Sequence, residues 1–208
     1  MKEQAYYEDL KRLARQVRAE HGLHSPRVLE SDLRRIYEKN GIVIDDWPYR
    51  LRNLRGAFIS DHLGTTVMLA SGLPQDPKVF TMAHELKHFY RDRHLGISYC
   101  EQSNLGKTLE IGAEIFAAEL LFPDKDFMTQ MRVMGIGTHE CLPRTLVRLK
   151  QKTRTTLSYA GLAIKAERLG YAPPRSLTTI KTWRKFEELY GDRAKRTGRR
   201  VLAPYSRR

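Results

Sequence analysis

The spacing of hydrophobic and polar residues changes twice along the chain, from helical to strand-like and back to helical. Apolar residues at helical spacing predict a first helix over residues 6–20 and a second over 31–40, with Ser31 as its cap. Short β-branched or aromatic runs then predict three strands, at residues 42–45, 57–60 and 65–70. Residues 61–64 are typical of a hairpin between the last two runs, so we expect a small antiparallel sheet of about three strands.

The helical period returns after the sheet. Asp76-Pro77 pairs a capping residue with a proline at the first helical position, which predicts the start of a helix that includes residues 81–90. Further helices are predicted at residues 108–122, 124–134, 143–152 and 157–169, and a last amphipathic helix carries Trp183, Phe186 and Tyr190. Pro173-Pro174 marks the predicted boundary between a domain of residues 1–172, with helical N- and C-terminal parts, and an extension of residues 173–208.

The charge of the chain is uneven. Its formal net charge is +13 over 208 residues, and the segment from Lys181 to the end holds ten Lys and Arg against three Asp and Glu. A basic C-terminal segment of this kind is typical of proteins with an acidic or nucleic-acid partner.

The predicted location is the cytoplasm. No apolar run approaches the ~20 residues of a membrane span, and the charged start of the chain lacks the apolar stretch of a signal peptide. Cys100 and Cys141 lie far apart and form no C-x-x-C pair, which suits a reducing compartment. We therefore expect no membrane partner.

The stretch TMAHELKHFY, residues 81–90, indicates a metal site. His84 and His88 are four residues apart, so on a helix their imidazoles project from one face and can share one ion. Zinc binds such nitrogens at about 2.0–2.1 Å and leaves room for a third ligand and a water molecule. Glu85 lies beside the first histidine, where its carboxylate can take the proton of a water that attacks a peptide carbonyl.

Two kinds of residue can complete this site. His94 lies six residues beyond His88, which is the metzincin spacing, but Arg91 stands where that pattern has a glycine for a sharp turn. The second kind is a carboxylate from the helix EIGAEIFAAELLFP, residues 110–123, where Glu110 and Glu114 are four residues apart.

The helix of residues 110–123 can approach the histidines closely because Ala113 and Ala117 are small and share a face with both glutamates. Glu110 and Glu114 remain alternatives on this reasoning. Glu119 is predicted to point elsewhere, into solvent.

The two stretches together resemble the ImmA/IrrE family of metallopeptidases, whose pattern pairs HExxH with a helix of the form ExxAxxFAxxLLxP. The matching residues of the second motif are Glu110, Ala113, Phe116, Ala117, Leu120, Leu121 and Pro123. The resemblance implies a zincin-like α+β domain with the small sheet over the HExxH helix. It also implies that the metal ligands are His84, His88 and Glu110, with Glu85 as the catalytic base. Glu114 departs from the family, since many members have a small polar residue there.

The resemblance also implies a function. Family members of known activity cut helix-turn-helix repressors and so release silenced genes. We therefore expect a gluzincin-like metalloendopeptidase with Zn²⁺ as its cofactor, Mn²⁺ being the alternative, which acts as an anti-repressor on a transcriptional repressor. The alternative function is a non-catalytic regulator that binds a repressor or DNA and uses a structural metal.

Two further segments carry expectations about partners. The run at residues 65–70 is expected as an exposed edge strand along the cleft, where an extended substrate can pair with it. The helix near residues 157–169, with Lys165 and Arg168 exposed, resembles a nucleic-acid reader. Its apolar stripe of Tyr159, Leu162, Ala163, Ala166 and Leu169 is more typical of a packed helix, so a nucleic-acid partner is not favoured.

Overall fold

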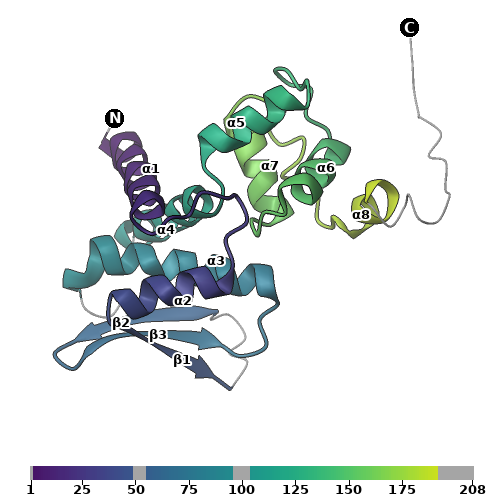
Figure 1. The fold of residues 1–208 in the computed structure, drawn as a ribbon. Coiled ribbons are helices and arrows are strands. Elements are labelled where there is room, and N and C mark those ends of the chain that lie inside the picture. Colours follow the sequence, from purple (N-terminus) through teal and green to yellow (C-terminus); the bar gives the residue numbers. More distant parts are fainter. Residues whose placement is uncertain (1, 49–54, 96–103, 192–208) are drawn as a thin grey trace, which may run out of the picture. The chain divides into compact units, whose positions relative to one another are not determined.

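The computed structural model describes residues 2–48, 55–95 and 104–191, and they form two compact units (Figure 1). Unit 1 comprises residues up to 127 together with 155–158, and unit 2 comprises residues 128–154 and those from 159 onward. The described residues hold eight α-helices and one three-stranded sheet. The predicted zincin-like α+β fold is confirmed. Cys100 and the tail after Gly191 lie outside the described residues.

The sheet of unit 1 is mixed, whereas an antiparallel sheet was expected. Its strands are β1 (Ile42–Trp47), β2 (Gly56–Asp61) and β3 (Gly64–Ala70), in the order β1-β3-β2. The predicted hairpin joins β2 to β3 antiparallel, with Asp61 opposite Gly64. β1 pairs with the other side of β3 and runs parallel to it, so the last strand in the chain lies in the middle of the sheet.

The position of β3 contradicts one expectation about substrate binding. β3 is bonded on both sides, so its backbone groups are already engaged and it cannot accept an added strand. The prediction of an exposed edge strand at residues 65–70 is therefore wrong. In the described sheet the two edges are β1 and β2.

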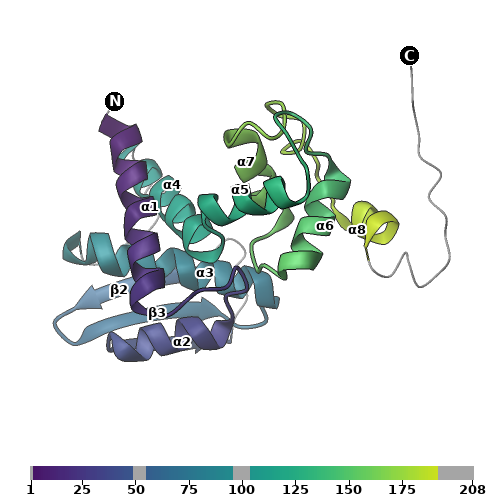
Figure 2. The same ribbon diagram turned by 45° about the horizontal axis from the view of Figure 1, so that its top comes forward.

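The helices α2 (Glu30–Lys39) and α3 (Gln75–Lys87) cover one face of this sheet, as Figures 1 and 2 show. The alternation along the strands explains why. Thr65, Val67 and Leu69 of β3 are buried beneath the helices, while the residues between them are partly exposed. This burial places β2 and β3 against the helix that carries the histidine pair.

A second layer of helices lies beyond α3. α4 (Asn104–Leu121) packs on α3, and α1 (Lys2–Glu20) packs on α4 (Figure 2). The contact between α1 and α4 is close at Gly112, where an added Cβ would lie 2.8 Å from Leu10 Cδ1. A hydrogen bond joins α2 to α3, because the hydroxyl of Tyr37 donates to the carbonyl of Met82 at 2.7 Å.

Glu119 is buried, contrary to the expectation of a solvated side chain. It is only 1% exposed because α1 lies over this face of α4. Its carboxylate accepts a hydrogen bond from Arg15 at 2.8 Å and another from the backbone N–H of Asp124 at 2.9 Å. It therefore caps the start of α5 (Asp124–Val133) and pairs with α1.

Unit 2 contains the end of α5 together with α6 (Pro143–Thr153), α7 (Tyr159–Arg168) and α8 (Arg184–Tyr190). Leu162, Ala163 and Ala166 of α7 are buried, as the apolar stripe predicts. Lys165 is buried too, at 2% exposed, so the expectation that it faces solvent is wrong. Its position is three residues from Leu162, which places it on the packed face.

Before α8, Trp183 stacks on Tyr159, with ring centroids 5.1 Å apart. None of the described helices is both long enough and apolar enough to cross a membrane.

Candidate metal centre

Three side chains converge where α3 and the turn after it face α4: His84, His88 and Glu110. Glu110 is 22 residues beyond His88 in the sequence. Nε2 of His84 lies 3.1 Å from Oε2 of Glu110, and Nε2 of His88 lies 3.6 Å from Oε1 of the same carboxylate. One ligand atom from each of the three residues lies within 4.8 Å of the other two.

The spacing of these donor atoms fits one tetrahedral ion. Ligand atoms bound to zinc at about 2.0–2.1 Å lie roughly 3.3 Å from one another. The imidazole nitrogens lie 3.1 and 3.6 Å from the two different oxygens of the Glu110 carboxylate, close to this value. Two imidazoles and one carboxylate are also the donor set of open zinc sites, in which a fourth position remains for water.

The charge around His84 favours a cation at this position. Burial lowers the pKa of His84, but its hydrogen bond to Glu110 and the negative charges of Glu85, Glu110 and Glu114 outweigh burial and leave the pKa raised. The same carboxylates would attract a metal ion in place of a proton.

His84 lies on α3 and His88 is the first residue after it, and both are fixed because the opposite face of α3 is packed. Val79, Met82 and Leu86 are fully buried against the sheet and the neighbouring helices. Directly after α3 the helix widens into a π-helical turn, His88–Asp92, and then a short 3-10 turn, Arg93–Leu95. Turns of this π-helical kind occur frequently at functional sites because they change the direction of one side chain relative to the rest.

The π-helical turn brings Asp92 against His88, a contact that the sequence reasoning missed. Oδ2 of Asp92 accepts a hydrogen bond from Nδ1 of His88 at 2.7 Å, which leaves the lone pair of Nε2 for a metal. The ammonium of Lys87, fully buried, donates to the same oxygen at 2.5 Å and to the carbonyl of Leu109 at 3.0 Å. A visible signal was an aspartate four residues after the second histidine.

Asp92 stays ionised in this setting. Burial raises the pKa of its carboxyl, but hydrogen bonds and charge from His88 and Lys87 outweigh burial and lower the pKa overall. A carboxylate fixed in this way holds the tautomer and the orientation of His88.

Glu85 lies under the first residue of β2. An added Cβ at Gly56 would lie 2.9 Å from Oε1 of Glu85 and 2.5 Å from Cγ2 of Thr81, so a glycine is needed for the strand to pass this close. The carboxylate is 5% exposed and accepts no hydrogen bond from the described residues. Burial raises its pKa, and the lowering effect of His84 and His88 does not cancel this. A raised pKa suits a general base.

The other two candidate ligands lie away from the cluster. Glu114 is exposed on α4 and adds its charge to the field at His84 without joining the converging group. His94 is exposed in the 3-10 turn, beside a hollow of about 720 Å³ that Ser60 and Asp61 also line. Arg91 stays within the π-helical turn and pairs with Asp9, and His94 is not part of the converging group, so the described geometry does not favour the metzincin alternative.

Comparisons with known proteins show the family of the chain. Residues 38–163 match the model of the IrrE N-terminal-like domain, the peptidase M78 family. No curated protein matches the chain. Among solved structures, a Mycobacterium tuberculosis transcriptional regulator matches with a TM-score of 0.53 and 16% identity.

The match to that regulator covers 82% of this chain and 49% of the other, so this chain spans about half the length of the relative. At this identity the likeness shows the fold alone. The family match covers more than half of the chain and contains both sequence motifs. The chain belongs to the IrrE N-terminal-like domain family, the peptidase M78 family, in agreement with its resemblance to the ImmA/IrrE proteins.

Proposed function

We propose that this protein is a zinc-dependent endopeptidase that hydrolyses a peptide bond in a regulatory protein, a helix-turn-helix transcriptional repressor. The observation that carries the proposal is the convergence of His84, His88 and Glu110 beside the buried carboxylate of Glu85. Zinc is favoured over Mn²⁺ because two of the three donors are imidazole nitrogens.

The residues take separate roles in this mechanism. His84, His88 and Glu110 would hold the ion, which supplies a polarised peptide carbonyl and a water of lowered pKa. Glu85 takes a proton from the attacking water and passes it to the nitrogen of the departing amine. Its burial beneath β2 excludes bulk water, and the lack of competing hydrogen bonds from the described residues leaves its carboxylate available for this proton.

The donor count favours catalysis over a structural metal. A structural zinc site is closed by four protein ligands, whereas a catalytic one has three and an open position. Only three donors converge in the part of the chain that the structure describes. A buried carboxylate with a raised pKa beside that position has no use in a structural site.

A protein substrate is supported by the free edge of the sheet. β2 is an edge strand of the described sheet, and Gly56 at its start lies beside Glu85. An extended peptide that pairs with β2 would therefore pass close to the base. The repressor as substrate rests on the family resemblance, and the transcriptional regulator that shares this fold is consistent with it.

The proposal is tested by incubating the zinc-loaded protein with a purified helix-turn-helix repressor. We expect two repressor fragments, seen by mass spectrometry, which disappear when a chelator removes the zinc and return when zinc is restored. Release of an intact repressor from its operator, with no fragment at any zinc concentration, would instead support the non-catalytic regulator.

Replacing Asp92 by Asn is expected to weaken zinc binding about 10–100-fold, because His88 loses its charged hydrogen-bond partner. Competition with a chromophoric chelator measures this affinity without any need for activity. Asp45→Asn, at an exposed position of β1, is the matched control and should bind zinc like the parent. Equal affinities for the Asp92 variant and the parent would show that Asp92 does not position His88.

A further inference from the structure

The net positive charge of the protein comes from unit 2. Unit 1 contains 18 Lys and Arg against 19 Asp and Glu, a net charge of −1. Unit 2 contains 19 Lys and Arg against 5 Asp and Glu, a net charge of +14. The candidate metal centre and the charge excess therefore lie in different parts of the molecule, and the metal chemistry does not account for the excess.

Helix α6 of unit 2 presents part of this charge as a regular row. Arg144, Arg148 and Lys152 are four residues apart, so they share one face at intervals of roughly 6 Å. All three are exposed and form no ion pair or hydrogen bond with the described residues. We refer to these three residues as the α6 basic row.

The residues between these cations point inward. Thr145, Leu146, Val147 and Leu149 are buried, so the exposed face of α6 carries no apolar side chain between Arg144 and Lys152. The row is therefore an uninterrupted cationic surface on a helix that its opposite face anchors in unit 2.

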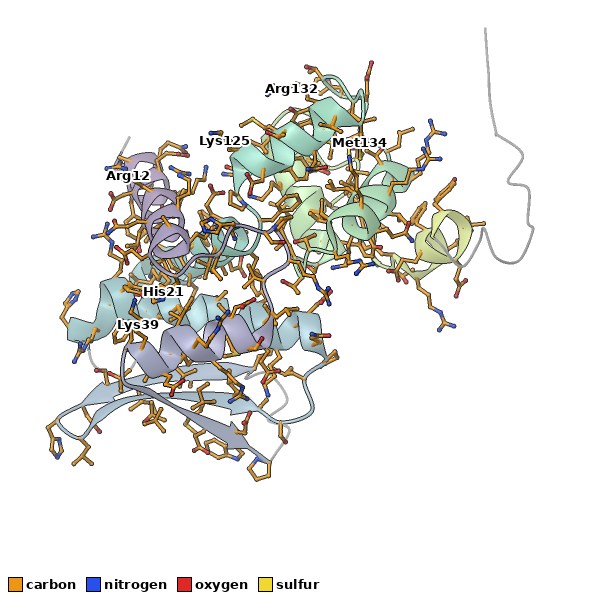
Figure 3. All side chains as sticks on the ribbon, viewed as in Figure 1. Arg12, His21, Lys39, Lys125, Arg132 and Met134 are labelled. Carbon is orange, nitrogen blue, oxygen red and sulfur yellow. The ribbon has the colours of Figure 1, made fainter. Side chains whose placement is uncertain are left out.

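A hollow adjoins the row and concentrates its charge. It measures about 470 Å³ and is lined by Met134, Ile136, Glu140, Arg144, Thr145 and Arg148. Figure 3 shows Met134 and, at the end of α5, Arg132, which is also exposed. The one acid in the hollow, Glu140, is engaged with the backbone N–H of Gly137 at 2.8 Å. In a concave surface with apolar walls, charges of one sign produce a stronger local electrostatic potential.

We propose that the α6 basic row binds the phosphate backbone of a DNA duplex, independently of its sequence. Phosphates follow each other along one strand every roughly 3.4 Å of the duplex axis, so two steps take roughly 6.8 Å. A row of cations at roughly 6 Å intervals can therefore place each cation beside every second phosphate. An acidic protein fits less well, because protein interfaces use an apolar or aromatic centre, whereas the α6 basic row has no exposed apolar side chain between its cations and the apolar residues nearby lie only in the adjoining hollow.

Base recognition is not part of this proposal. On α7, Lys165 is buried, and the exposed positions are Ala160, Ile164 and Arg168. Among these residues only Arg168 can hydrogen-bond to a base edge, and sequence readout needs several such side chains in the groove. The α6 basic row would therefore position the protein on DNA and leave the choice of target to other contacts.

The test is fluorescence anisotropy of a short labelled duplex of random sequence with the full chain. The triple variant Arg144→Gln, Arg148→Gln, Lys152→Gln removes the three charges of the row, and glutamine keeps the helix because it is a good helix former. We expect more than about tenfold weaker binding, and a plot of log affinity against log salt that is shallower by about 2.7, since each phosphate contact contributes about 0.9. Circular dichroism checks that the variant is folded.

The control removes three exposed cations elsewhere in unit 2, by Lys181→Gln, Arg184→Gln, Lys185→Gln. It has the same net charge as the row variant, and we expect binding within about twofold of the parent. Equal losses in both variants, no binding by the parent, or polyglutamate that competes as well as DNA would overturn the proposal. Glu85→Gln should bind DNA like the parent, so this result is independent of peptidase activity.

Discussion

Glu85→Gln is expected to abolish peptide cleavage while the protein keeps its zinc. The amide has the shape of the carboxylate but cannot take a proton from water, so the general-base contribution, about 10²–10⁴-fold in rate, is lost. Because Glu85 is not one of the three converging donors, the metal content should equal that of the parent. Parallel measurements of repressor fragmentation and zinc content by mass spectrometry check both parts.

The matched control for this variant is Glu114→Gln. Glu114 is an exposed glutamate that also contributes to the field at His84, so the control removes a nearby charge without removing the base. It should cleave at close to the parent rate. Cleavage by Glu85→Gln at the parent rate would contradict the assignment of Glu85 as base, whatever the metal content.

The second large effect is expected at the third ligand. Glu110→Ala should lower zinc affinity by more than about 100-fold, which exceeds the loss for a residue that only supports a ligand. The reason is geometric, because the Glu110 carboxylate approaches both imidazoles, at 3.1 Å and 3.6 Å. Zinc titration against a competing chelator gives the affinity of each variant.

Glu114→Ala separates the two glutamates of α4. Glu114 is one turn further along the helix and exposed, so its loss should change zinc affinity by only a small factor. A larger loss for Glu114→Ala than for Glu110→Ala would show that the third donor was wrongly assigned. Retention of parent affinity in both variants would remove the three-residue site altogether.

The sequence alone was sufficient for those features that depend on neighbouring residues. The helix with the two histidines was expected to start at Pro77 with Asp76 as its cap and is observed from Gln75, because the apolar period acts within a few turns. The capping prediction was wrong, since Pro74 stands at the N-cap and Asp76 lies in the first turn. The shared face of His84 and His88 follows from the same local geometry. The β2–β3 hairpin at residues 61–64 was also predicted, since turn residues act over four positions.

The features that tertiary structure decided all depend on distant segments. Whether Glu110 or Glu114 faces the histidines depends on how α4 is rotated against α3, and periodicity places both on one face. The sequence did not predict that β3 lies in the middle of the sheet, because this depends on hydrogen bonds between β3 and the distant strand β1. The contact of Asp92 with His88 lies in a π-helical turn, whose widened geometry the spacing of the residues did not predict.

Which side chains are buried also depended partly on local spacing and partly on tertiary packing. Helical spacing identified the apolar residues of α7, yet it did not predict that Lys165 and Glu119 are desolvated, because only the packing of other helices removes water from a charged side chain. Local sequence thus determined the helix and the shared face of His84 and His88, together with the position of Glu85 beside them. The approach of Glu110 to both histidines and the free edge of the sheet were decided when segments far apart in the chain came into contact.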